Sequence, residues 1–189
     1  MNNRLLLFIS ALFASCVSFM FCACTGSSFL RQKLIFPELD VVFSKNGQIH
    51  SYKIDMNKPK VVTYIWGEHN LRRLLSETPS LKINNLISRN PEIDFIFYLD
   101  GINLSDVEKI LPILDKYDVT YPIILDFNSI FAEANGNRYL KGKTDDCCTL
   151  YGYFCDKSNR IFKSGGGIIG TEKSKMYFDP SFARFKATL

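Results

Sequence analysis

The most informative absence in this sequence is that of cysteine between residues 25 and 146. All six cysteines lie outside that stretch: Cys16, Cys22, Cys24, Cys147, Cys148 and Cys155. Once the N-terminal group is set aside, an odd number remains, so the chain is not a small scaffold held together by disulfides. Chemistry that needs a pair of thiols in the first two thirds of the domain is also excluded.

Charged side chains are absent from Leu5 to Leu30, behind the single basic residue Arg4. A short basic start, an apolar run and a cysteine after a small residue are typical of a bacterial lipoprotein export signal. An uncleaved transmembrane anchor is the alternative, because Leu5 to Phe21 comes close to the roughly 20 apolar residues of a membrane span. Both interpretations place the rest of the chain at a membrane of the bacterial cell envelope, on the periplasmic or the outer-membrane face.

Cys24 fits the acylated cysteine of such a signal better than its two neighbours do. It follows Ala23 and precedes a polar run. Cleavage at Cys16 would leave an apolar mature end, and Cys22 follows the bulky Phe21. We therefore predict a signal peptide over residues 1–23, a lipidated tether over residues 24–33 and one folded domain over residues 34–189.

Charge and histidine content argue against two classes of function. Lys and Arg number 23 and Asp and Glu number 19, and this small excess does not indicate a nucleic-acid partner. Two histidines, His50 and His69, are few for a metal centre. The segment Gly165–Gly170 has the spacing of a dinucleotide fingerprint, but too little chain follows it for the helix and strand that such a site needs. We therefore predict no metal, no cofactor and no nucleic acid.

Apolar patterns predict strands and helices that alternate along the chain. The predicted strands cover residues 40–43, 48–54, 61–66, 93–99, 122–125, 151–155 and 160–162. The predicted helices cover residues 71–87, 105–117, 129–133 and 180–187. Alternation of this kind indicates a central, partly parallel sheet covered on both faces, and the hairpin near the end of the chain makes that sheet mixed.

Three local signals set boundaries between these elements. Asn46-Gly47 is a strong hairpin turn signal between the first two strands. Pro79 falls inside the first predicted helix and should either kink it or begin a new one. Ser105 and Glu108 have the spacing of a capping box, which predicts that the next helix begins there.

Five segments, taken in order, carry a family resemblance. They are Val61–Trp66, Thr78–Leu81, Ile93–Tyr98, Tyr121–Asp126 and Tyr153–Ile161. In this order they resemble the thioredoxin-like superfamily, nearest to its peroxiredoxin and membrane-anchored thiol-disulfide oxidoreductase branch, from about Leu34 to Ile169. The resemblance implies an α/β fold: a thioredoxin-like three-layer α/β/α sandwich with a central mixed sheet and an N-terminal β-hairpin.

The residues that perform redox chemistry in this superfamily are missing from their usual places. Active members carry Cys-x-x-Cys between the first core strand and the next helix, where the helix N-terminus lowers the pKa of the attacking thiol. Here the corresponding residues are Gly67, Glu68, His69 and Asn70, a vestigial active-site loop without a thiol. The cis-proline expected near Leu150 is missing too. The resemblance therefore implies a degenerate active site.

Cys147 and Cys148 are the remaining redox candidates. The acidic pair Asp145-Asp146 just before them should raise the pKa of their thiols, which argues against a nucleophile. A buried or incidental pair is therefore the preferred interpretation. A zinc site that joins them to His69 is conceivable, but adjacent cysteines lack the usual ligand spacing. Cys155 fits a core position.

Three functional hypotheses follow. The leading one is a lipid-anchored envelope protein whose thioredoxin-like domain has lost its dithiol and acts as a binding or accessory module for an envelope protein or peptide. The second is a thiol-disulfide oxidoreductase or peroxiredoxin-like antioxidant enzyme that uses Cys147 or Cys148. The third is a structural component of a larger envelope assembly.

Overall fold

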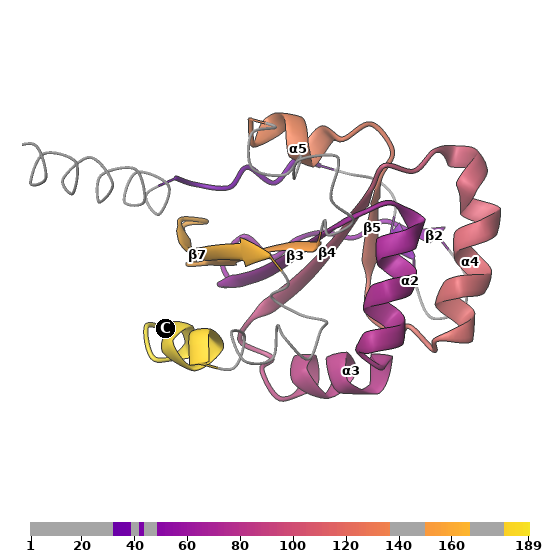
Figure 1. Ribbon diagram of the computed structural model, residues 1–189. Helices are drawn as coiled ribbons and strands as arrows, with labels where there is room; N and C mark the ends of the chain where they lie inside the picture. Colours follow the sequence, from indigo (N-terminus) through magenta and orange to yellow (C-terminus); the bar gives the residue numbers. More distant parts are fainter. Residues whose placement is uncertain (1–31, 39–41, 44–48, 137–149, 167–179) are drawn as a thin grey trace, which may run out of the picture.

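One mixed sheet of seven strands organises the chain (Figure 1). The computed structural model describes residues 32–38, 42–43, 49–136, 150–166 and 180–189. The strands are β1 (Val42–Phe43), β2 (Ile49–His50), β3 (Lys60–Trp66), β4 (Asp94–Asp100), β5 (Ile123–Asp126), β6 (Leu150–Cys155) and β7 (Ile161–Gly166), in the spatial order β2-β1-β5-β4-β3-β6-β7. Neighbours β3, β4 and β5 are parallel and the other pairs are antiparallel. The predicted central mixed sheet is confirmed.

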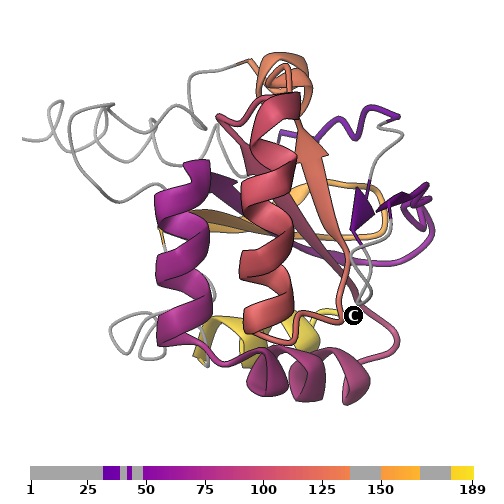
Figure 2. The same ribbon diagram turned by 90° about the vertical axis from the view of Figure 1, so that its right-hand side faces the viewer.

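Helices cover one face of this sheet, and a short helix with extended chain covers the other. The helices are α2 (Gly67–Glu77), α3 (Ser80–Ser88), the 3-10 turn η2 (Leu104–Asp106), α4 (Val107–Lys116), α5 (Ile130–Ala134) and a last helix over residues 180–186. Figure 2 shows α2 and α4 side by side against the sheet, with α3 and the last helix below them. In the described ranges no helix is long and apolar enough to cross a bilayer.

Alternation along β3 explains why the sheet needs cover on both faces. Val61 and Ile65 pack into a core cluster with α2, α3, α4 and the last helix. Val62 and Tyr64 point to the opposite face, into a second cluster with Phe131 of α5. Side chains of successive strand residues point to opposite faces, so a strand buried on both sides reads as the continuous apolar run of the sequence.

Of the local signals that predicted boundaries between elements, one is confirmed and one is wrong. Pro79 begins a new helix: it is the N-cap of α3, and α2 ends at Glu77. The capping box was predicted in the wrong place, because Asp106 rather than Glu108 closes it, by accepting the N–H of Asn103 at 2.9 Å. The 3-10 turn then leads into α4. Asn46-Gly47 lies outside the described residues.

The predicted strand 48–54 is shorter in the structure, since β2 ends at His50. Tyr52 and Ile54 still alternate and pack against the second core cluster. Their apolar alternation therefore reflects burial without a strand ladder, which is why the sequence pattern overestimated the strand.

Candidate functional site

The carboxyl ends of the parallel strands β3, β4 and β5 meet at one edge of the sheet, and α2 begins there. The first helical residue, Gly67, has φ 74°, and the N-cap residue Trp66 offers no side-chain bond to the free N–H groups of the first turn. Asn70 ties that turn to the strand, because its Nδ2 donates to the carbonyl of Trp66 at 2.6 Å. Its Oδ1 meets no donor within the part of the chain described here.

The four residues predicted as a vestigial loop belong to the first turn of α2, so their assignment to a loop was wrong. The helix begins at Gly67 because the positive φ of glycine turns the chain sharply out of the strand. Glu68 pairs with Arg72 at 2.7 Å, His69 is exposed, and Asn70 is only 6% exposed. No residue of this turn can act as a thiol nucleophile, since cysteine is absent from residues 25–146.

A buried carboxylate holds the ends of three strands together just behind that turn. Asp100, the last residue of β4, is almost fully buried. It accepts hydrogen bonds from the Tyr64 hydroxyl on β3, from the N–H of Gly101, and at 2.8 Å from the Ser129 hydroxyl after β5. Burial raises the pKa of Tyr64, and the bonded Asp100 raises it further. With three donors Asp100 is a structural acceptor.

A second buried carboxylate, Asp126, lies beside Asp100 in register on β5. Its two oxygens accept the N–H groups of Ile130 and Phe131 at 2.7 and 2.9 Å, so it caps the start of α5. Burial raises the pKa of the Asp126 carboxyl, the two N–H bonds oppose that rise, and the neighbouring Asp100 adds to it. Both carboxylates therefore fix the geometry of the edge.

The single tryptophan of the chain covers this edge. Trp66 lies so close to Gly101 that a Cβ on the glycine would sit 2.9 Å from ring atom Cε2. Gly101 has φ 69°, a conformation that favours glycine. The Trp66 ring thus packs over Gly101, where the ends of β3 and β4 meet.

We expect Gly101→Ala to be more destabilising than Gly136→Ala. Both glycines have positive φ, but a Cβ at Gly136 meets nothing within 4 Å. The backbone strain of about 1 kcal/mol is therefore shared, and displacement of Trp66 adds roughly 1–3 kcal/mol for Gly101 alone. Urea unfolding measures the difference, and a red shift of tryptophan fluorescence should accompany only Gly101→Ala. Equal losses for the two variants would contradict the contact.

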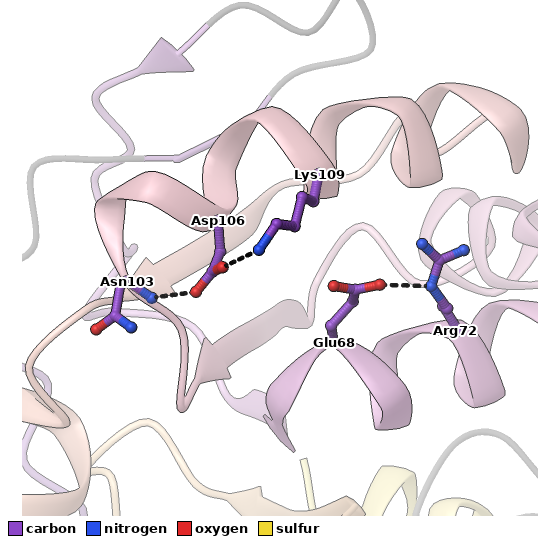
Figure 3. A network of polar contacts seen from close by, with 5 residues as sticks. All are labelled: Glu68, Arg72, Asn103, Asp106 and Lys109. Atoms are coloured by element: carbon purple, nitrogen blue, oxygen red, sulfur yellow. Dashed lines mark hydrogen bonds and ion pairs between the residues drawn. The ribbon is translucent and has the colours of Figure 1, made fainter.

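Charged side chains of both signs line the rim between α2 and α4 (Figure 3). Asp106 pairs with Lys109 at 3.0 Å, and on α2 Glu68 turns toward Arg72. The bonded Asp106 raises the pKa of Lys109, with a smaller contribution from Glu68 across the gap. Exposed pairs like these contribute little to stability.

Exposed apolar side chains accompany that charged rim. Leu104, just after β4, is 73% exposed, and Ile130, after β5, is 38% exposed. Because β3, β4 and β5 are adjacent and parallel, the residues that follow them share the edge with Trp66 and His69. We call Trp66, His69, Leu104 and Ile130 the carboxyl-edge surface.

The cysteines divide into described and undescribed positions. Cys155 is buried in β6, as predicted for a core residue, and burial raises the pKa of its thiol to about 12. Cys24, Cys147 and Cys148 lie outside the described residues. In the described ranges, no three His, Cys, Asp or Glu side chains are grouped so that they could hold a metal ion.

The opposite edge of the sheet also carries polar groups. Lys60 is fully buried there; its Nζ donates to the carbonyl of Lys58 at 2.7 Å and lies 5.5 Å from the ring centre of Phe36. Burial lowers the pKa of Lys60. An open hollow of about 750 Å³ lies at the same edge, between Asp94 and the end of α3. Two pairs of its side chains are hydrogen-bonded, Tyr52 to Asp94 at 2.7 Å and Thr120 to Asn84 at 2.6 Å.

Sequence reasoning missed the two buried carboxylates and their partners. The signal was present, because Asp100 and Asp126 directly follow apolar runs that were predicted as parallel strands, and the ends of such strands meet. Ser129 and Tyr64 carried no comparable signal, since their roles depend on the register of β3, β4 and β5.

Comparison with solved structures identifies the fold, whereas comparison with sequences gives no match. No model of a known protein family matches the chain, and no curated protein matches its sequence. Three of the solved structures that are similar in three dimensions are a thioredoxin-like protein in the oxidized form (TM-score 0.54, 14% identity, 82% of this chain and 97% of that chain), the mitochondrial 2-Cys peroxiredoxin from Plasmodium falciparum (0.53, 12%, 80% and 91%) and a putative thiol:disulfide interchange protein DsbE from Chlorobium tepidum (0.51, 8%, 82% and 97%). At such low identities the likeness concerns architecture alone. The chain has a thioredoxin-like fold.

Proposed function

We propose that this chain is a lipid-anchored protein of the bacterial cell envelope whose thioredoxin-like domain binds a protein or peptide without performing dithiol exchange. One observation carries the proposal: the first turn of α2, where the resemblance places a thiol pair, consists of Gly67, Glu68, His69 and Asn70. Attack by a thiolate is favoured at a helix N-terminus, and no sulfur is available in this turn.

The carboxyl-edge surface is the proposed binding surface. Asp100 and Asp126 hold the strand ends rigidly, so the edge is preorganised and a partner loses little free energy in ordering it. Leu104 supplies an apolar contact, and the charged rim supplies polar ones. Acylation at Cys24 would confine this surface to a membrane.

Site-specific photo-crosslinking in intact cells tests the binding surface. We expect a crosslinker at His69 to give one discrete protein adduct, and the same group at the exposed Lys82 of α3 to give none. Leu104→Glu should remove the adduct, because it places a charge in the apolar part of the surface. Adducts that are identical at both positions would contradict a specific partner.

The alternative function is a thiol enzyme acting through Cys147 or Cys148. It is favoured by one contact: Leu150, which follows these cysteines after one residue, pairs with Ile65 at the end of β3 that leads into α2. β6 thus begins beside the helix N-terminus at which thiol chemistry occurs in active relatives.

Insulin reduction with dithiothreitol separates the two functions. We expect the purified chain to give the rate of the uncatalysed reaction, and the variant with both Cys147→Ser and Cys148→Ser to give the same rate. A catalysed rate that Cys148→Ser abolishes would replace the binding module with the enzyme.

A further inference from the structure

An extended segment before β1 is built into the fold by a short antiparallel bridge between Lys33 and Arg160. Two flanking main-chain hydrogen bonds of 2.9 Å hold it, from the N–H of Leu34 to the carbonyl of Asn159 and from the N–H of Ile161 to the carbonyl of Gln32. In this pattern the bridged residues form a pair without direct hydrogen bonds, with Cα atoms about 4.5 Å apart. The side chains of such a pair lie on the same face.

The next residues of the segment are fixed by a side-chain clamp. Asn135, after α5, accepts the N–H of Ile35 and donates to its carbonyl, both at 2.8 Å. Leu34 points into the second core cluster and is 5% exposed. Because neighbours in an extended chain point to opposite sides, Lys33 and Ile35 point to solvent.

Two cations therefore lie next to each other on an ordered surface. Like charges directly opposite in a strand pair are destabilising, and within the described ranges neither Lys33 nor Arg160 forms an ion pair. The acid nearest in sequence, Asp156, is occupied by the turn, because its Oδ1 accepts the N–H groups of Ser158 and Arg160 at 2.8 and 2.9 Å. Among the residues that the structure describes, no acidic side chain therefore forms an ion pair with either cation.

The surroundings of the cation pair suit a headgroup layer. Lys157 in the adjacent turn is exposed, and Ile35 is 57% exposed beside Lys33. A hollow of about 360 Å³ lies against Lys33 and Asn135. Exposed acids occur further along the segment and on α5, at Glu38 and Glu133. We call Lys33, Ile35, Lys157 and Arg160 the basic strip.

We propose that the basic strip docks on the anionic phospholipid headgroups of the membrane that holds the chain, with Ile35 against the headgroup layer. This inference rests on the proposed lipid anchor. Only residues 25–31 separate Cys24 from Gln32, a reach of about 30 Å at full extension, so the strip cannot leave the vicinity of the bilayer. Basic residues near an anionic leaflet are attracted to it. Docking turns α2 and α4, on the opposite face of the sheet, away from the bilayer.

Hydrogen–deuterium exchange of the full-length chain tests the docking. The protein is extracted from membranes and reconstituted in vesicles of phosphatidylcholine, with or without phosphatidylglycerol. We expect phosphatidylglycerol to slow amide exchange in residues 32–36 and 157–161 by about tenfold, and high salt to remove the effect. The variant K33E/R160E should lose the slowing, and the neutral variant K33Q/R160Q should reduce it. The matched control K82E/R89E, with the same charge change on exposed residues of α3 and its C-cap, should keep it.

Five results would contradict the docking or separate it from the anchor. Exchange that is equal on both kinds of vesicle, or loss of the slowing in K82E/R89E, overturns the docking. Slowing by inorganic phosphate alone, without anionic lipid, overturns the assignment to lipid. The mass of the N-terminal peptide from the same sample reports acylation independently. Protection without acylation supports the docking and removes the anchor, whereas acylation without protection removes only the docking.

Discussion

Asp100→Ala should lower the free energy of unfolding by about 3–5 kcal/mol, measured by urea denaturation. The reason is that the substitution would leave several hydrogen-bond donors without their acceptor. The Tyr64 hydroxyl, the Ser129 hydroxyl and the N–H of Gly101 all donate to this one buried carboxylate. The buried Tyr64 hydroxyl left without its acceptor costs about 1–3 kcal/mol, and the part-buried donors Ser129 and Gly101 would each lose a hydrogen bond to a charged group.

Tyr64→Phe is the matched control for that substitution. It removes one donor and leaves the carboxylate with its other two partners, so we expect a loss of only about 1–2 kcal/mol. If Asp100→Ala cost no more than Tyr64→Phe, the carboxylate would not be the centre of the network. The carboxyl-edge surface would then need another source of rigidity.

Phe131→Ala should destabilise the chain by about 3–5 kcal/mol. Phe131 is fully buried, and the ring of Tyr98 stacks on it at 4.0 Å between centroids. Phe36 and Tyr64 contribute further rings at 5.9 and 6.3 Å. Because α5 has only five residues, it cannot move to fill the resulting cavity without loss of its cap at Asp126. Thermal unfolding measures the effect.

Phe162→Ala supplies the comparison, since this ring is 38% exposed and covers the buried Phe185 from outside. We expect it to cost less than about 1 kcal/mol. Phe131→Ala should also speed amide exchange in residues 32–36, because Phe36 packs on the lost ring. A loss for Phe131→Ala that matches the loss for Phe162→Ala would show that the second core cluster tolerates a void.

The sequence predicted those parts of the fold whose signals are local and periodic. Val61 to Trp66 was predicted as a strand from its apolar run, and the periodicity behind Ser105 predicted the helix that became α4. The start of α2 was missed because Gly67 opens the helix without a capping side chain at Trp66. The capping box was misplaced because Asn103 and Asp106 have the same spacing as Ser105 and Glu108.

The candidate site was less accessible than the fold, because it depends on contacts between distant segments. The absence of a thiol from the first turn of α2 followed from the sequence alone. The roles of Tyr64, Asp100 and Ser129 follow only from the parallel register of three strands. Asn135 is a further example: nothing in its sequence context indicates that its side-chain amide forms two hydrogen bonds with the main chain of Ile35.

The hydrogen bonds between Asn135 and the main chain of Ile35 join residues that lie 100 positions apart in the sequence. They therefore constrain the order in which parts of the chain fold. Loops of this length close slowly, because their entropy must be lost before the contact is gained. During synthesis β3 keeps one unpaired edge until its partner β6, at residues 150–155, leaves the ribosome. An apolar strand with an open edge is prone to aggregation, so we expect the nascent chain to be most prone to aggregation before β6 has been made.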